Sequence, residues 1–277
     1  MTLLQMKAGG TEALVNSDNG QLVSLKEEGV EFMHDGGRSD SEDSAWRASE
    51  ITCFPIFGRS NNHQVVFSGQ TYDVDQHGLS RALPWKVVEY FHEGVTLDQF
   101  YRGDPIPNPK TGRKGHPDTM TYMPFHLRKI FNLRQHNLTA IFSVVNNGTG
   151  PMAYNFGWHP GFQIQGEVDQ GVFLDSHGQW ICSLDDVLES PNEVRVEKNC
   201  NEIVYLGDQA RKIKVWTPAD SFTDMVLWVP ENTGPVCMEP VVNPIEPGAK
   251  YFDEGEFSVL EPGKGATYRV KIVLGDR

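Results

Sequence analysis

Short segments in which hydrophobic and polar residues alternate recur along the chain, separated by clusters of turn-forming residues. Alternation with a period of two indicates half-buried β-strands. Several joints contain residues that tolerate positive φ, as tight hairpins require: Asn19-Gly20, Ser68-Gly69 and Asn147-Gly148. The pattern predicts an all-β protein, with strands within residues 13–25, 63–74, 84–101, 126–158, 211–218, 225–229 and 266–274.

The longest alternating stretch, residues 127–145, predicts two long strands that turn near residues 135–137. Helical character is confined to one short candidate, residues 183–190, which Pro191 would end. The 27 glycines and 17 prolines are spread evenly, and no repeat of fixed period is visible. We therefore expect residues 1–277 to form one domain, a size at which β-sandwiches commonly do so.

Charge and cysteine usage narrow the class of protein. The chain has 24 Lys+Arg against 37 Asp+Glu, a formal net charge of −13, which would repel nucleic acid and anionic membrane surfaces. Its four cysteines form no C-x-x-C pair and are expected to be reduced thiols. No apolar run is long enough to span a membrane and no signal sequence is visible. We expect a cytoplasmic protein that binds neither nucleic acid nor membranes.

Two long polar stretches, residues 36–50 and 102–119, are predicted to be loops. The second contains prolines together with Arg102, Lys110, Arg113 and Lys114. Long ordered loops on a β scaffold often surround a functional site, but a tolerated surface insertion has the same appearance.

Three polar clusters lie at the ends of otherwise apolar strands. The first contains Arg59 and His77. Arg59 follows Gly58 and could direct its donors toward ligand oxygens or simply be an exposed charge. His77 precedes Gly78, where a packed turn histidine is the alternative to a functional one. The second cluster contains His159, which lies between an aromatic residue and a proline that would hold the imidazole rigidly.

The third cluster is Cys-Met-Glu-Pro at residues 237–240, where a single carboxylate interrupts a core-like strand. A buried carboxylate is costly unless it is paired or functional, which makes Glu239 a candidate catalytic residue; a solvent-facing strand end is the alternative. Metalloprotease, P-loop, dinucleotide and serine-hydrolase motifs are absent from the sequence. We therefore expect neither a metal nor a cofactor.

The ordered set FPIFGR, QHGLSRALPW, NFGWHPGF and CMEP resembles the aldose 1-epimerase (mutarotase) family. The resemblance covers the chain from about Asn19 to about Leu274. It implies a large antiparallel β-sandwich, the galactose mutarotase-like supersandwich, with a sugar cleft on a concave sheet.

The same resemblance implies roles for individual residues. The catalytic base corresponds to Glu239 and the catalytic acid to His159, and we expect the free enzyme to hold the first ionised and the second protonated. The resemblance also implies that Arg59, His77 and, as a further acidic ligand, Asp224 bind the substrate. From the residues themselves we expect Trp158 to offer an aromatic face to the pyranose and Arg81 to contact the substrate. Phosphorylated sugars would need basic residues around the cleft, for which Arg81, Arg102, Arg113 and Lys114 are the candidates.

The implied activity is that of an isomerase in hexose metabolism, which interconverts the α and β anomers of a hexose or hexose phosphate. One carboxylate and one imidazole suffice to open a cyclic hemiacetal, because the step moves one proton from the anomeric hydroxyl and one to the ring oxygen. Two other functions fit the same residues: a non-catalytic carbohydrate sensor, and a glycoside hydrolase or lyase, although hydrolysis normally needs a second carboxylate. The expected partner is a small sugar, and the expected state is a monomer or homodimer.

Overall fold

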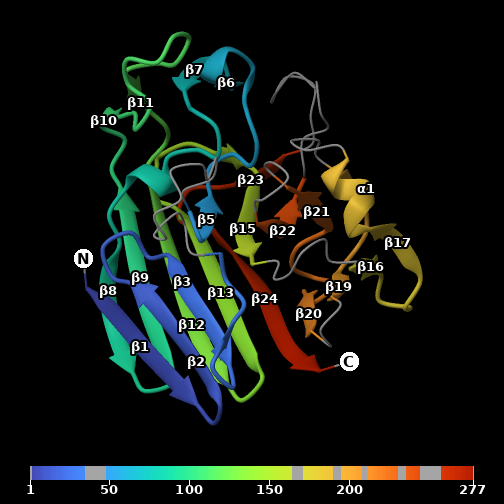
Figure 1. The fold of residues 1–277 in the computed structure, drawn as a ribbon. Helices are drawn as coiled ribbons and strands as arrows, with labels where there is room; N and C mark the ends of the chain where they lie inside the picture. The colour runs from blue at the N-terminus through green and yellow to red at the C-terminus, as the bar shows by residue number, and fades with distance from the viewer. Residues whose placement is uncertain are drawn as a thin grey trace.

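The computed structural model describes residues 2–34, 48–163, 171–189, 195–207, 211–229, 235–243 and 257–276. Its largest element is a nine-stranded antiparallel sheet, ordered β17-β16-β19-β20-β24-β13-β12-β9-β8 (Figure 1). The bounds of these strands, in chain order, are β8 Lys86–Phe91, β9 Gly94–Tyr101, β12 Phe125–Arg134, β13 Asn137–Asn146, β16 Val172–Leu174, β17 Trp180–Ser183, β19 Glu202–Leu206, β20 Arg211–Trp216 and β24 Gly265–Asp276.

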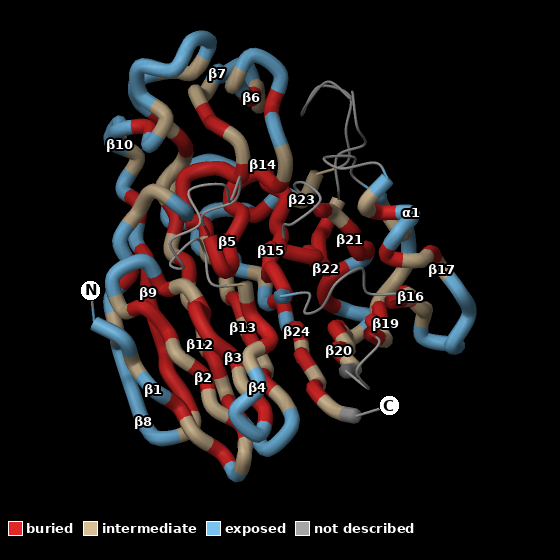
Figure 2. The backbone as a smooth tube through the Cα atoms, in the orientation of Figure 1, coloured by how far each residue is buried: buried red, intermediate tan, exposed pale blue. Residues whose placement is uncertain are grey.

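The hairpin β12–β13 at the centre of this sheet confirms the strongest prediction from the sequence. Along both strands buried and half-buried positions alternate residue by residue, as Figure 2 shows. The two strands pair in continuous register from Phe125↔Asn146 to Arg134↔Asn137. One face of the hairpin is therefore apolar and packs inward, while the other is polar.

Two further sheets lie against the nine-stranded one. The first is N-terminal and lies over β8, β9 and β12 (Figure 1), with strands β1 Leu3–Ala8, β2 Thr11–Asn16, β3 Leu22–Glu27 and β4 Val30–Glu31. The second has the order β18-β21-β22-β15-β5, with bounds β5 Glu50–Cys53, β15 Phe156–Phe162, β18 Arg195–Glu197, β21 Asp224–Trp228 and β22 Val236–Val242. The result is the large antiparallel β-sandwich expected from the sequence.

Short strand pairs and turns connect the sheets and lie at their edges. They are the two-stranded pairs β6 Gln64–Phe67 with β7 Gln70–Asp73, β10 Ile106–Pro107 with β11 Thr119–Met120, and β14 Met152–Tyr154 with β23 Ser258–Leu260, and the 3₁₀ turns η1 Asn61–His63 and η2 Ser80–Ala82. The predicted short helix is α1, Leu184–Leu188, which begins at a capping box in which Ser183 and Asp186 bond reciprocally. No helix among the described residues is long and apolar enough to cross a membrane.

Aromatic side chains fill the space between the five-stranded and nine-stranded sheets. Trp158 on β15 packs against Phe131 and Phe142 of the β12–β13 hairpin, with ring centroids 6.3 and 5.8 Å away. Phe156 on the same face of β15 stacks on Tyr268 of β24, 4.8 Å away. These contacts fix β15, and with it every side chain on the opposite face of that strand.

One ion pair is completely buried in this core. Lys129 of β12 is 1% exposed and its Nζ lies 2.7 Å from Oε1 of Glu50 on β5, which is 0% exposed. Lys129 also donates to the carbonyl of Gly20, and the indole N–H of Trp158 donates to Oε2 of Glu50 at 2.8 Å. The pair therefore joins all three sheets through hydrogen bonds that satisfy both charges.

Candidate active site

The candidate site occupies the face of the five-stranded sheet that points away from the nine-stranded sheet. Pairing places Glu239 of β22 opposite Val226 of β21, and His159 of β15 opposite Ile51 of β5. Side chains on a strand alternate between faces, so His159 points to the side opposite its neighbour Trp158. The strand geometry thus separates a core face from a face that carries polar chemistry.

Glu239 and His159 meet on that face. Nε2 of His159 lies 3.5 Å from Oε2 of Glu239, and both side chains are almost wholly buried. The imidazole lies roughly perpendicular to two other rings, with the centroid of His77 5.2 Å away and that of Trp228 5.5 Å away. These two contacts restrict the orientation of His159 relative to the carboxylate.

His77 is presented by a tight turn just before η2. Its backbone has φ +63°, a left-handed conformation that costs a non-glycine residue about 1–3 kcal/mol and that clusters at functional sites. The next residue must be glycine, because a Cβ on Gly78 would lie 2.2 Å from the carbonyl oxygen of Phe54. Nδ1 of His77 accepts from the backbone N–H of Gly58 and lies 3.3 Å from Sγ of Cys53.

A small apolar cluster supports the acid–base pair. It is separate from the main core and consists of Ala48, Ile51, Cys53, Phe57, Val226 and Val241. Gly157 allows the Phe57 ring to lie directly on β15, since a Cβ there would be 2.2 Å from that ring. Because this floor is apolar and excludes water, it strengthens electrostatic interactions above it.

Burial opposes the charged forms that the sequence led us to expect for these two residues. Burial raises the pKa of the Glu239 carboxyl well above its ordinary value of 4.5. Burial, together with the nearby Arg81 cation, lowers the pKa of His159 to about 3. Both shifts favour a neutral carboxylic acid beside a neutral imidazole over an ion pair. The neutral pair and the ion pair contain the same number of protons and differ only in whether one proton is on Oε2 of Glu239 or on Nε2 of His159. Transfer of this proton interconverts the two forms.

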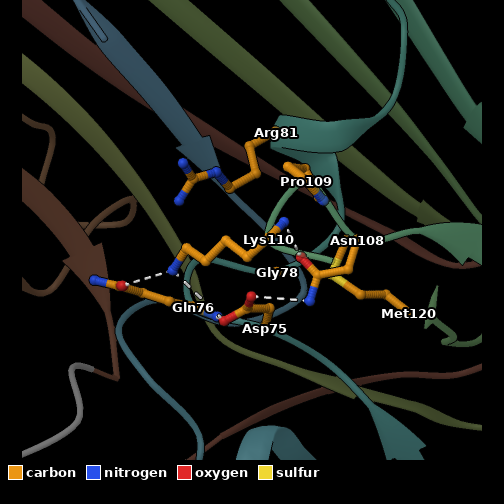
Figure 3. A pocket seen from close by; sticks show the side chains of 8 residues that line it. All are labelled: Asp75, Gln76, Gly78, Arg81, Asn108, Pro109, Lys110 and Met120. Carbon is orange, nitrogen blue, oxygen red and sulfur yellow. Dashed lines mark hydrogen bonds and ion pairs between the residues drawn. The ribbon is translucent and has the colours of Figure 1, made fainter. Parts of the chain in front are cut away.

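A small open pocket lies beside the turn that presents His77, walled by residues of that turn, by Arg81 and by residues of the 102–119 loop. Figure 3 shows the side chains of Arg81 and Lys110 extending in the same direction across it. Lys110 bonds to Oε1 of Gln76, and Gln76 in turn contacts Nε2 of His77 at 3.2 Å. The 102–119 loop therefore does border the candidate site.

Positive charge gathers at this pocket although the chain as a whole has a net charge of −13. Burial and then the cations Arg81, Arg59 and Arg113 lower the pKa of Lys110, with Asp75 acting in the opposite direction. Burial lowers the pKa of His77 as well, helped by His159, Arg81, Lys110 and Arg59. Arg59 and Arg81 are exposed and free to meet a ligand, whereas His77 is held neutral.

Two predicted ligands lie differently from what the sequence suggested. Trp158 is 0% exposed and its indole faces the core, so its placement does not allow the stacking on a sugar that we expected of it. Asp224 shares the face of Glu239, but its carboxylate accepts hydrogen bonds from the backbone N–H of Asn199 and the hydroxyl of Thr223. Asp224 thus organises its own loop as well as facing the site.

Sequence analysis did not identify several side chains that help to build the site. Trp228 is the tryptophan that packs against His159, with ring centroids 5.5 Å apart. Cys237 has a thiol that lies, with donor atoms of His159 and Glu239, in a set whose members are all within 4.8 Å of one another. Cys237 could have been predicted, because residues two apart on a strand face the same side and Cys237 is two residues from Glu239. Trp228 could not have been predicted before its pairing partner was known.

These features define a class: β-sandwich proteins of the galactose mutarotase-like fold, with a buried Glu–His pair on the face of one sheet. The aldose 1-epimerase family model matches residues 2–273, and the chain belongs to that family. Among curated proteins, none matches the chain significantly in sequence.

Solved structures support the same fold. A galactose mutarotase-like protein from Lactobacillus casei superposes with a TM-score of 0.80 at 17% identity, covering 99% of this chain and 100% of its own. A galactose mutarotase related enzyme from Lactobacillus acidophilus gives a TM-score of 0.73 at 19% identity, with coverage of 99% and 98%. A protein from Synechocystis gives 0.75 at 19% identity, with coverage of 100% and 96%.

Proposed function

We propose that the protein is an aldose 1-epimerase that interconverts the anomers of a hexose and favours phosphorylated hexoses. The observation that carries the proposal is the buried Glu239–His159 pair, 3.5 Å apart, with His159 packed against His77, whose turn lines the basic pocket. A distance of 3.5 Å is too long for a strong hydrogen bond, and a bound hydroxyl would be close to both groups.

The chemistry follows from the single proton that the pair shares. In the ion-pair form, Glu239 accepts the proton of the anomeric hydroxyl while His159 protonates the ring oxygen, and the C–O bond breaks to give an aldehyde. Rotation about the bond next to the aldehyde carbon exposes its other face. The pair is now in its neutral form, so His159 accepts the proton of the attacking hydroxyl and Glu239 returns a proton to the aldehyde oxygen. No net proton or electron is exchanged with solvent.

The neighbouring residues have supporting roles in this scheme. Sugar hydroxyls are proposed to be positioned by neutral His77, exposed Arg59 and Asp224. Trp228 packs against the imidazole of His159. Arg81 and Lys110 are proposed to bind the phosphate of a phosphorylated hexose, since charge-assisted contacts to phosphate are strong and specific. The proposed location is the cytoplasm, where such phosphates are found.

Saturation-transfer NMR tests the activity directly. We expect catalysed exchange between the α and β resonances of at least one aldose in a panel of free and 6-phosphorylated hexoses. Saturable sugar binding without any increase in exchange would instead support a sensor. Release of reducing sugar from disaccharides, with no effect on exchange, would support a hydrolase.

The pH profile of kcat/KM should reflect the pKa shifts of the buried pair. The active pair holds one proton; it gains a second when His159 is protonated and loses its proton when Glu239 ionises. With the pKa of His159 lowered to about 3 and that of Glu239 raised, the acidic limb should lie well below pH 4.5, the ordinary value for a glutamate. Initial exchange rates from about pH 2.5 to 8 measure this. An acidic limb near 4.5 would show that Glu239 is ionised at rest.

Selectivity for phosphorylated sugars should depend on the two cations that line the pocket. We expect Arg81→Gln and Lys110→Gln each to lower the ratio of kcat/KM for hexose 6-phosphate over free hexose by about 10- to 100-fold. Arg102→Gln is the matched control, because Arg102 is exposed and not among the described residues of the pocket wall. An unchanged ratio in both pocket variants would remove phosphate recognition from this pocket.

A further inference from the structure

A second cluster of polar side chains lies behind the wall of the pocket. His63 comes from η1, Asp75 follows β7, and His116 belongs to the loop between β10 and β11. Nδ1 of His63 is 3.0 Å from Oδ1 of Asp75, and Nδ1 of His116 is 2.9 Å from Oδ2. The two imidazole rings are 4.3 Å apart, so both converge on the same carboxylate.

Each member of this cluster is held firmly. Asp75 is 3% exposed, and its oxygens accept from the backbone N–H of Gln76 at 2.6 Å and from the side-chain amide of Asn108 at 3.0 Å. Asn108 also donates to the carbonyl of Pro117, next to His116. His63 has φ +57° and follows Asn62 at +53°, consecutive left-handed residues that direct the imidazole inward.

We propose that His63, Asp75 and His116 form a binding site for a divalent transition metal ion of the zinc type, with an open fourth position. One donor atom from each residue lies within 4.8 Å of the other two. Zinc binds imidazole nitrogen and carboxylate oxygen at about 2.0–2.2 Å, so its ligand atoms are separated by about 3.3 Å and only small shifts are needed. Asn108 and the N–H of Gln76 would hold the carboxylate ligand from behind, as is usual around metal ligands.

Hydrogen bonding among these residues leaves one buried atom unsatisfied. Nδ1 of His116 is aligned with Asp75, but Nδ1 of His63 makes no hydrogen bond of acceptable geometry despite the 3.0 Å separation. Both imidazoles turn Nδ1 toward the one carboxylate, and that of His63 meets it with poor hydrogen-bonding geometry. A cation that His63 and Asp75 both coordinate would satisfy the buried nitrogen.

Lys110 is the charge that opposes metal binding. Its ammonium is 3.7 Å from Oδ1 of Asp75 and also donates to Gln76, which gives it a second partner when a metal occupies the carboxylate. The substitution Lys110→Met, which removes this charge, should therefore tighten metal binding by about tenfold. That factor corresponds to the Coulomb energy of two charges a few ångströms apart in a screened site.

The bound ion would connect three segments that are far apart in sequence. Asp75 is two residues before His77, so the ion would fasten the turn that presents this histidine. Metal that binds only the folded state raises Tm. The inference does not depend on the proposed catalytic activity, because its measurements are metal binding and thermal stability.

Metal binding by the whole chain tests the site. We would strip the protein with a chelator, titrate Zn²⁺ against a chromophoric chelator, and record the visible absorption of the Co²⁺ form. We expect one zinc equivalent at micromolar concentration with a rise in Tm. His63→Gln and His116→Gln should each weaken binding by at least about 100-fold. His126→Gln is the matched control, because His126 is 3.2 Å from a different buried carboxylate, Asp98.

Cys237→Ser alters the other set of potential metal ligands among the described residues, which Cys237 forms with His159 and Glu239. The proposal is supported if zinc binding is unchanged in Cys237→Ser and His126→Gln but lost in the two ligand variants. It is overturned if the parent binds no zinc at micromolar concentration, or if binding survives removal of both histidines. If a ligand variant does not fold, Lys110→Met decides: tighter binding than in the parent supports the site, and equal or weaker binding contradicts it.

Discussion

Glu239→Gln is expected to fold, bind sugar and lose most of its turnover, with kcat reduced by about 10² to 10⁴. Glutamine keeps the volume and the acceptor oxygen but can neither take nor give the proton that the pair exchanges. The corresponding loss of transition-state stabilisation is about 3 to 5 kcal/mol. Exchange NMR gives kcat, and a sugar titration on the same preparation gives binding. Exchange within about threefold of the parent would exclude Glu239 from proton transfer.

The same variant should be more stable than the parent. The pKa of Glu239 is raised in the folded state by burial, so its contribution to stability is fully present below 4.5 and is lost as pH rises through the folded pKa. Glutamine does not ionise, and the gain in Tm over the parent should grow between pH 4.5 and 8. His159→Gln is the companion variant: it should lose turnover too.

Lys129→Met is expected to destabilise the fold by about 3 to 5 kcal/mol, the largest stability effect that we expect for a residue outside the site. The substitution leaves the carboxylate of Glu50 buried without the cation that now lies 2.7 Å from its Oε1. It also removes a donor to the carbonyl of Gly20 and a cation 4.8 Å from the centre of the Trp85 ring. Denaturant unfolding measures the loss.

Two further variants show whether the uncompensated charge is the cause. Lys86→Met, at an exposed position of β8, is the matched control and should change stability by less than about 0.5 kcal/mol. The double variant Glu50→Gln/Lys129→Met should recover at least half of the loss, because the glutamine oxygen can still accept from Trp158 without carrying charge. If Lys129→Met unfolds with a free energy close to the parent's, the pair is not a source of stability.

Local patterns were sufficient to predict the strands and to mark Glu239 and His159 as candidates, whose roles in proton transfer stay a proposal. Alternation along 127–145 predicted the β12–β13 hairpin because one face of a sheet must be buried and side chains alternate with a period of two. A capping serine and a following proline bounded the one short helix. A single carboxylate in a core-like strand marked Glu239, since an unpaired buried charge is too costly to be kept without a function.

The local sequence pattern gives no information about several other expectations. The 36–50 loop lies largely outside the described residues, and the oligomeric state stays a prediction. The sequence placed Trp158 beside the sugar because it is adjacent to His159, but adjacent residues on a strand face opposite ways, and only the packing of β15 decides which way is inward.

Tertiary structure alone decided which distant residues meet and what their protons do. The register of β21 against β22 brings Trp228 to the acid–base pair, and the path of the 102–119 loop brings Lys110 to the pocket and His116 to Asp75. Burial in this assembled site, which no residue type implies, then makes the carboxyl a weaker acid and the imidazole a weaker base. Sequence supplies the groups, but desolvation and neighbouring charge depend on the whole fold, because both act through space and not along the chain.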